Sequence, residues 1–171
     1  MSAEPGVSDT PASALRGLRI LLLSIAVIET IGALQAAPIL FGDLSEVTGP
    51  GPGGWIVTLA LVLRPVFAIA ALVLALRRAL RVAIMALSAV VLVNWFSMFP
   101  SVVLHGLDFE SSGSLYASAH FLLAPVLALA ALALAGRNEQ LGLAGIMVSI
   151  PTLADMAGLV AFAIGVMIYG F

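Results

Sequence analysis

Long apolar runs separated by short polar segments make up almost all of this chain. An α-helix needs about 20 mainly apolar residues to cross the hydrocarbon core of a bilayer. Five runs reach that length, so the pattern predicts an all-α, polytopic transmembrane bundle. The predicted spans are residues 18–41, 55–76, 82–104, 115–135 and 141–170.

The polar segments between these runs carry residues that end helices. Residues 42–54 are rich in glycine and proline and are predicted to be an irregular loop. The arginines at 77, 78 and 81 mark a tight turn between the second and third spans. Residues 1–13 are small, polar and proline-containing, which predicts a disordered cytoplasmic tail. Residues 14–171 then form a single transmembrane bundle.

Two of the apolar runs allow more than one interpretation. The first resembles a signal peptide, but Glu29 interrupts its apolar core and Pro38 follows its only cleavage-like site, which favours a retained span. The last run contains Pro151 and is longer than one straight crossing requires. We predict one kinked helix; the alternative is a short interfacial piece to Ser149 and a span that begins at Pro151.

Composition narrows the functional classes. The chain is 62% hydrophobic and 9% charged, far from the soluble average of about a quarter charged. Cysteine is absent, which excludes disulfides, iron–sulfur ligation and thiolate nucleophiles. All seven basic residues are arginine, so no lysine Schiff base can form. A basic patch with interleaved aromatic residues is also missing, so we expect no nucleic-acid partner.

The charges of the connections predict the orientation in the membrane. All but one of the arginines fall on one side of a five-span arrangement: Arg16, Arg19, Arg77, Arg78, Arg81 and Arg137. Acidic residues fall on the other side: Asp43, Glu46, Asp108 and Glu110. Arginine-rich connections stay in the cytoplasm, so the N-terminus is predicted to be cytoplasmic and the C-terminus outside. The predicted location is the inner (cytoplasmic) cell membrane.

Four of the five predicted spans each carry one strongly polar side chain at a similar depth, roughly 17 to 21 Å from the cytoplasmic end at the helical rise of 1.5 Å per residue. These residues are Glu29, Arg64, Asn94 and Asp155. A lone charge in mid-membrane costs about 2.5 to 3.5 kcal/mol, so we predict that Glu29 and Arg64 pair. Asp155 then either shares Arg64 or stays protonated.

Two histidines suggest a second, separate site. His105 ends the third span and His120 lies near the start of the fourth, with Asp108 and Glu110 between them. Imidazoles and carboxylates can ligate a metal ion, and two histidines can hold a haem. The spacing matches no established metal motif. His120 shares a helix face with small residues, which predicts that it points into the bundle. We therefore predict no cofactor, and a haem or metal ion at His105 and His120 remains the alternative.

These features favour a non-enzymatic membrane protein, either a scaffold or an accessory subunit of a membrane complex. Its predicted partners are the lipid bilayer and other membrane subunits or further copies of itself. A small proton-coupled carrier that works through Glu29, Arg64 and Asp155 is the first alternative. A redox subunit that binds haem or a metal is the second.

Overall fold

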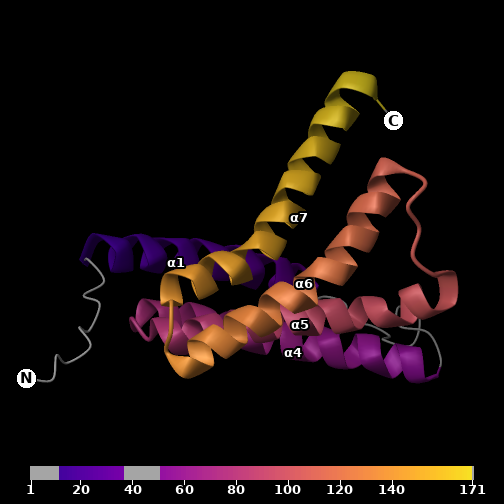
Figure 1. Ribbon diagram of the computed structural model, residues 1–171. Coiled ribbons are helices and arrows are strands. Elements are labelled where there is room, and N and C mark those ends of the chain that lie inside the picture. The colour runs from indigo at the N-terminus through magenta and orange to yellow at the C-terminus, as the bar shows by residue number, and fades with distance from the viewer. Residues whose placement is uncertain (1–11, 37–50, 171) are drawn as a thin grey trace, which may run out of the picture.

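The computed structural model describes residues 12–36 and 51–170, and these residues form helices without any strand. The helices are α1 (Ala12–Gln35), α4 (Pro52–Leu76), α5 (Leu80–His105), α6 (Ser112–Arg137) and α7 (Leu141–Tyr169) (Figure 1). Each of these five helices is long enough and apolar enough to cross a membrane. The all-helical prediction with five spans is confirmed to this extent.

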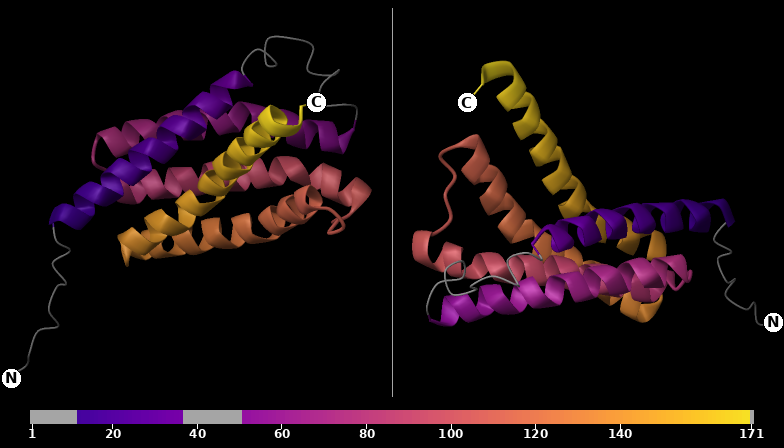
Figure 2. Two further views of the ribbon diagram at one scale, coloured as in Figure 1. Left: turned by 90° about the horizontal axis from the view of Figure 1, so that it is seen from above. Right: turned by 180° about the vertical axis from the view of Figure 1, so that it is seen from behind.

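Helix α5 lies at the centre of the arrangement and contacts each of the other four helices. Helix α1 also packs against α4 and α7, and α6 packs against α7. Consecutive helices run antiparallel where short turns join them, as the views in Figures 1 and 2 show. Residues from α1, α4, α5 and α7 can therefore meet inside one bundle.

Four of the five helices begin earlier than the predicted spans, and two of these starts fall inside segments predicted to be non-helical. Helix α1 starts at Ala12, inside the segment predicted to be a disordered tail, because alanine, leucine and arginine in its first turns favour a helix. Helix α4 starts at Pro52, inside the predicted 42–54 loop. Proline suits the first turn of a helix, where its missing N–H has no acceptor to lose. The remainder of the predicted tail and residues 37–50 lie outside the described residues.

The last apolar run is one helix that continues through Pro151, as the kinked interpretation predicted. Figure 1 shows that α7 changes direction near its middle and that its C-terminal half leaves the bundle. Proline removes one backbone hydrogen bond and pushes against the preceding turn, which accounts for the bend. Helix α6 contains Pro125 and also bends.

Small side chains fill the interfaces between helices. The alanines on the inner faces of α4 and α6 are fully buried: Ala68, Ala71, Ala75, Ala128, Ala131 and Ala135. Alanine lets two helix backbones approach closely. Larger core side chains come from α1 and α5, among them Leu22, Ile84 and Leu87. The helices therefore pack closely against one another, with little side-chain volume between them.

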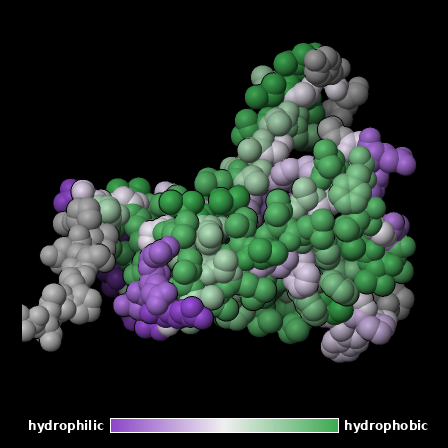
Figure 3. All heavy atoms as spheres, viewed as in Figure 1, coloured by the Kyte–Doolittle hydropathy of each residue, from purple (hydrophilic) through white to green (hydrophobic). Residues whose placement is uncertain are grey.

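The outer surface is apolar instead of polar. Leucine, isoleucine, valine and phenylalanine side chains stand exposed along every helix, and Figure 3 shows apolar residues over most of the visible face. Water solvates a contiguous apolar surface of this size poorly, whereas lipid tails solvate it well. The structure is thus compatible with an integral membrane protein.

Arginines gather at one end of the bundle and hold helix ends together. Arg19 donates to the carbonyl of Leu76 at 3.2 Å, and Arg81 donates to the carbonyl of Gly136 at 2.7 Å. Each bond satisfies a carbonyl at a helix C-terminus, where positive charge is favoured. Because α5 runs away from this end, the connection with Asp108 and Glu110 lies at the opposite end (Figure 1).

Candidate functional site

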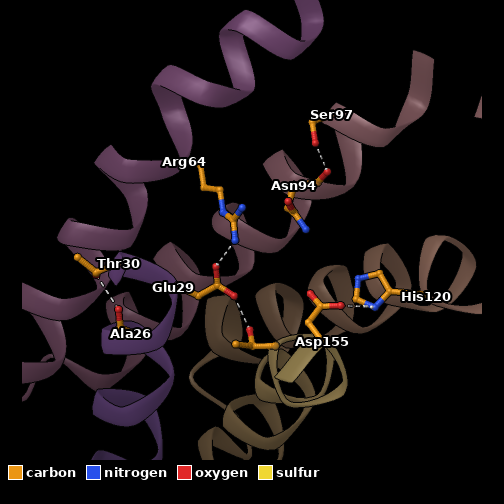
Figure 4. Close-up of polar contacts among 9 residues, drawn as sticks. Ala26, Glu29, Thr30, Arg64, Asn94, Ser97, His120 and Asp155 are labelled. Carbon is orange, nitrogen blue, oxygen red and sulfur yellow. Dashed lines mark hydrogen bonds and ion pairs between the residues drawn. The ribbon is translucent and has the colours of Figure 1, made fainter. Parts of the chain in front are cut away.

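Glu29 connects three helices through its two carboxylate oxygens. Arg64 Nη2, from α4, donates to Glu29 Oε2 at 3.1 Å. Thr152 Oγ1, from α7, donates to Glu29 Oε1 at 2.7 Å. Figure 4 shows the carboxylate of Glu29 directed toward the guanidinium of Arg64. The predicted pair is present; the side chain of Glu29 is 9% exposed and that of Arg64 is 32% exposed.

Small residues make room for this ion pair. A Cβ atom added at Gly32, one turn after Glu29, would lie 3.6 Å from Arg64 Nη2. Ala60 and Ala68, one turn on either side of Arg64, are buried against neighbouring helices. The absence of larger side chains here lets the guanidinium lie along α1 and reach the carboxylate.

Arg64 has more donors than Glu29 uses. Its Nε is buried and has no hydrogen-bond partner among the described residues. Beside it lies a cavity of about 120 Å³ between α1, α4 and α5, whose polar lining comes from Arg64, Asn94 and Ser97. The Ser97 hydroxyl donates to the backbone carbonyl of Asn94 at 2.6 Å. The structure thus places Asn94 and Arg64 at the same cavity. Figure 4 shows the two side chains near each other without a direct bond between them.

Asp155 belongs to a different polar group. Tyr116 donates its hydroxyl to Asp155 Oδ1 at 2.9 Å, and His120 Nδ1 lies 3.4 Å from the same oxygen. The expectation that Asp155 shares Arg64 is therefore wrong, because its contacts are with α6. The alternative, that Asp155 stays protonated, remains a prediction. Asp155 follows Thr152 by three residues, which turns it about 60° around the helix axis. Since α7 packs against both α1 and α6, Thr152 faces α1 while Asp155 faces α6.

The sequence interpretation missed two contributors, Thr152 and Tyr116. Both have a signal in the sequence. Tyr116 and His120 are four residues apart and share a helix face, and Thr152 lies one turn before Asp155. A search for polar side chains within one turn of Asp155 and of His120 would have found them.

The four residues of the predicted second site make separate contacts. His105 Nδ1 lies 3.0 Å from the carbonyl of Ser101 in its own helix, whereas His120 contacts Asp155. Asp108 accepts from the backbone N–H of Glu110 at 2.9 Å. Nowhere in residues 12–36 and 51–170 do three His, Asp or Glu side chains come close enough to hold a metal ion. The absence of a cofactor stays a prediction, and a haem or metal ion at His105 and His120 stays its untested alternative.

Hydrogen bonds also fix the charge of Asp108 in the α5–α6 connection. The backbone N–H of Glu110 is the main cause that lowers the pKa of Asp108 below its usual value, and the Ser114 side chain adds to the effect. A donor that binds a carboxylate stabilises its ionised form. Asp108 therefore carries a negative charge at neutral pH, at the end of the bundle opposite the arginines.

No family model matches the chain, and neither the curated proteins nor the solved structures contain a match. The chemistry of the two polar groups is the remaining guide to function. The Glu29 group is a neutral ion pair beside a cavity. The Asp155 group is a carboxylate whose side chain is 48% exposed, whereas the His120 side chain beside it is 8% exposed.

Replacing Tyr116 by phenylalanine tests how strongly α6 holds the kinked part of α7. The change removes the hydroxyl that donates to Asp155 and keeps the aromatic ring, which lies 3.8 Å from a Cβ added at Gly158. We expect a loss of about 1 kcal/mol in the free energy of unfolding, measured by thermal unfolding in detergent. Ser97→Ala is the control, since that hydroxyl bonds only within α5. Equal, negligible losses would show that the Tyr116 bond does not secure α7.

Proposed function

We propose that the chain is an integral protein of the inner (cytoplasmic) cell membrane and acts as a non-enzymatic subunit of a membrane complex. Five helices of sufficient length and apolarity support the membrane location. The end with the arginines is the proposed cytoplasmic end, which puts the N-terminus in the cytoplasm and the C-terminus outside.

The C-terminal half of α7 is the observation that carries the proposal. Large apolar side chains are exposed on different sides of this half: Leu159 (61%), Phe162 (63%) and Met167 (86%). Figure 1 shows it standing clear of the other helices. A helix in a bundle normally turns one face to lipid and another to its neighbours. Here the described part of the chain supplies few neighbours, so we infer that another polypeptide supplies them.

The partner that fits this surface is a transmembrane helix of another membrane protein. Ala157, Ala161 and Gly165 repeat every four residues along α7, and small residues at this spacing let a second helix approach closely. At the base of this segment, Asp155 contacts Tyr116 and His120 through Oδ1, but its side chain is 48% exposed and can accept a further hydrogen bond at membrane depth. A partner helix with a basic or hydrogen-bond-donating side chain at that level would provide it.

Native mass spectrometry of the protein, purified in mild detergent from its own membrane, tests the subunit proposal. We expect other polypeptides to be recovered with it in a fixed stoichiometry. Recovery as a monomer would contradict the proposal. Recovery only as a homo-oligomer would also contradict it and would identify a second copy as the neighbour of α7.

A bulky residue on the small ridge of α7 should separate the protein from its partner. We expect Ala161→Leu to reduce the co-purified partner at least several-fold, because close helix contact depends on small side chains. The variant should unfold at the same temperature as the wild type, since Ala161 is exposed in the single chain. Ala133→Leu, an equal change at an exposed position of α6, is the control and should retain the partner. Retention by both variants would exclude this face of α7.

A proton-coupled carrier is the second candidate function. The specific observation in its favour is the cavity beside Arg64, whose guanidinium has donors that Glu29 does not use. Transport through the bundle needs a polar binding place at mid-membrane, and this cavity lies where α1, α4 and α5 meet. Proton-coupled flux in liposomes is the direct assay.

A further inference from the structure

The guanidinium of Arg64 has N–H donors without a hydrogen-bond acceptor in the described part of the chain, and one of these donors is buried. An arginine side chain has five N–H donors, and one hydrogen bond to Glu29 is formed. Nε is buried without a partner among the described residues. A buried donor that loses water without gaining an acceptor costs about 1 to 3 kcal/mol. An acceptor in the adjoining cavity would relieve this cost.

The cavity offers a consistent set of donors for such an acceptor. Its volume is about 120 Å³, which is enough for a small molecule. Asn94 adds a side-chain amide and Ser97 a hydroxyl, while Ala33 and Ala60 form an apolar wall. A planar guanidinium binds carboxylates and phosphates through two parallel N–H bonds, and of these a small carboxylate carries the lower charge into the bundle.

Charge balance determines what must accompany the ligand. Glu29 and Arg64 together are neutral, so an added carboxylate would leave one net negative charge at a buried site. Such a charge is expensive in a medium of low dielectric constant. A proton on Glu29 restores neutrality. Arg64 then exchanges one carboxylate for another, and Thr152 remains beside Glu29.

We propose that this cavity binds one small carboxylate together with one proton, with the carboxylate on Arg64 and the proton on Glu29. The proposal rests on the carrier candidate and names its substrate class. It does not depend on a partner for α7. No covalent bond changes: a carboxylate and a proton enter, and the same two species leave.

Other ionisable groups near Glu29 are engaged elsewhere. Helices α4, α5 and α7 pack against α1. From α4 the group that faces Glu29 is Arg64, and from α5 the nearest polar residue at the cavity is uncharged Asn94. From α7 it is the hydroxyl of Thr152, since Asp155 pairs with α6. Glu29 is therefore the group that takes up the proton.

Binding of radiolabelled acetate to the purified full-length protein tests the proposal. One proton taken up per anion makes the apparent Kd about tenfold weaker for each unit rise in pH, at pH values where free acetate is ionised. Glu29→Gln imitates the protonated state, so this variant should bind acetate with a Kd that no longer depends on pH. Binding by the wild type that does not vary with pH would overturn the proposal.

Two further variants test whether acetate binds at this cavity and whether a loss of binding could come from misfolding. The double change Glu29→Gln with Arg64→Met leaves no unpaired charge and should not bind acetate at any pH. Asp155→Asn lies outside the cavity and should bind like the wild type, with the same pH dependence. Binding by the double variant, or a pH dependence lost in Asp155→Asn, would contradict the assigned roles.

Acetate flux in liposomes distinguishes the binding site from the carrier. Flux that is present in the wild type and absent in the double variant supports both proposals. Binding without flux would retain the site and reject the carrier function. Acetic acid crosses a lipid bilayer unaided, so flux is counted only above that of protein-free liposomes. Such flux in the double variant would overturn the site, whatever the binding assay shows.

Discussion

Replacing Arg64 by methionine is expected to lower the free energy of unfolding by about 3–5 kcal/mol. The change leaves the carboxylate of Glu29, 9% exposed, without its positive partner. The Thr152 hydroxyl still donates to it, but one neutral donor does not replace an ion pair. Thermal unfolding in detergent, or titration with a denaturing detergent, measures the loss. Arg137→Met is the matched control, because Arg137 lies exposed at the end of α6 and should change stability by about 0.5 kcal/mol or less.

The double change Glu29→Gln with Arg64→Met should cost less than Arg64→Met alone. Both charges are then gone, and glutamine still offers an oxygen to Thr152. Removing a whole buried pair is often nearly neutral, whereas removing one partner is costly. Additive losses from the two single changes would show that the pair contributes no coupling, which would contradict its role in joining α1 to α4.

The Glu29–Arg64 pair could be predicted because few arrangements satisfy its physical requirements. Each residue lies near the middle of an apolar run, and consecutive runs usually pack as neighbours. A charge at that depth needs a partner, and small residues on both helices indicate the face that approaches. The depth of each charge, the order of the helices and the face with small residues can all be derived from residue positions in the sequence.

The partners of Asp155 could not be predicted in the same way. Its contacts depend on how far α7 is rotated about its axis and on the direction it takes after Pro151. Rotation follows from packing against two helices at once, and the sequence of α7 alone does not encode it. The cavity beside Arg64 has the same origin, since residues from three helices form it. Helix starts such as Pro52 were missed because proline both breaks helices and begins them.

The contact between α1 and α7 should be the most sensitive to added volume. A Cβ atom at buried Gly145 would collide with Cδ1 of Leu18 and lie 3.8 Å from Cδ2 of Leu22. Overpacking a closely packed interior costs about 1–3 kcal/mol and sometimes more. We expect Gly145→Leu to cost at least this much. Gly145→Ala should cost less, because the end of the Leu18 side chain can move aside.

Gly142 provides a matched control on the same helix. A Cβ atom there meets nothing within 4 Å, so Gly142→Leu should change the free energy of unfolding by about 0.5 kcal/mol or less. Adding Leu18→Ala to Gly145→Leu should recover part of the loss, since the smaller side chain returns volume to the same interface. Equal stability of the Gly142 and Gly145 variants would mean that α7 does not pack closely against α1 at Gly145. Thr152 would then lack the fixed position from which it reaches Glu29.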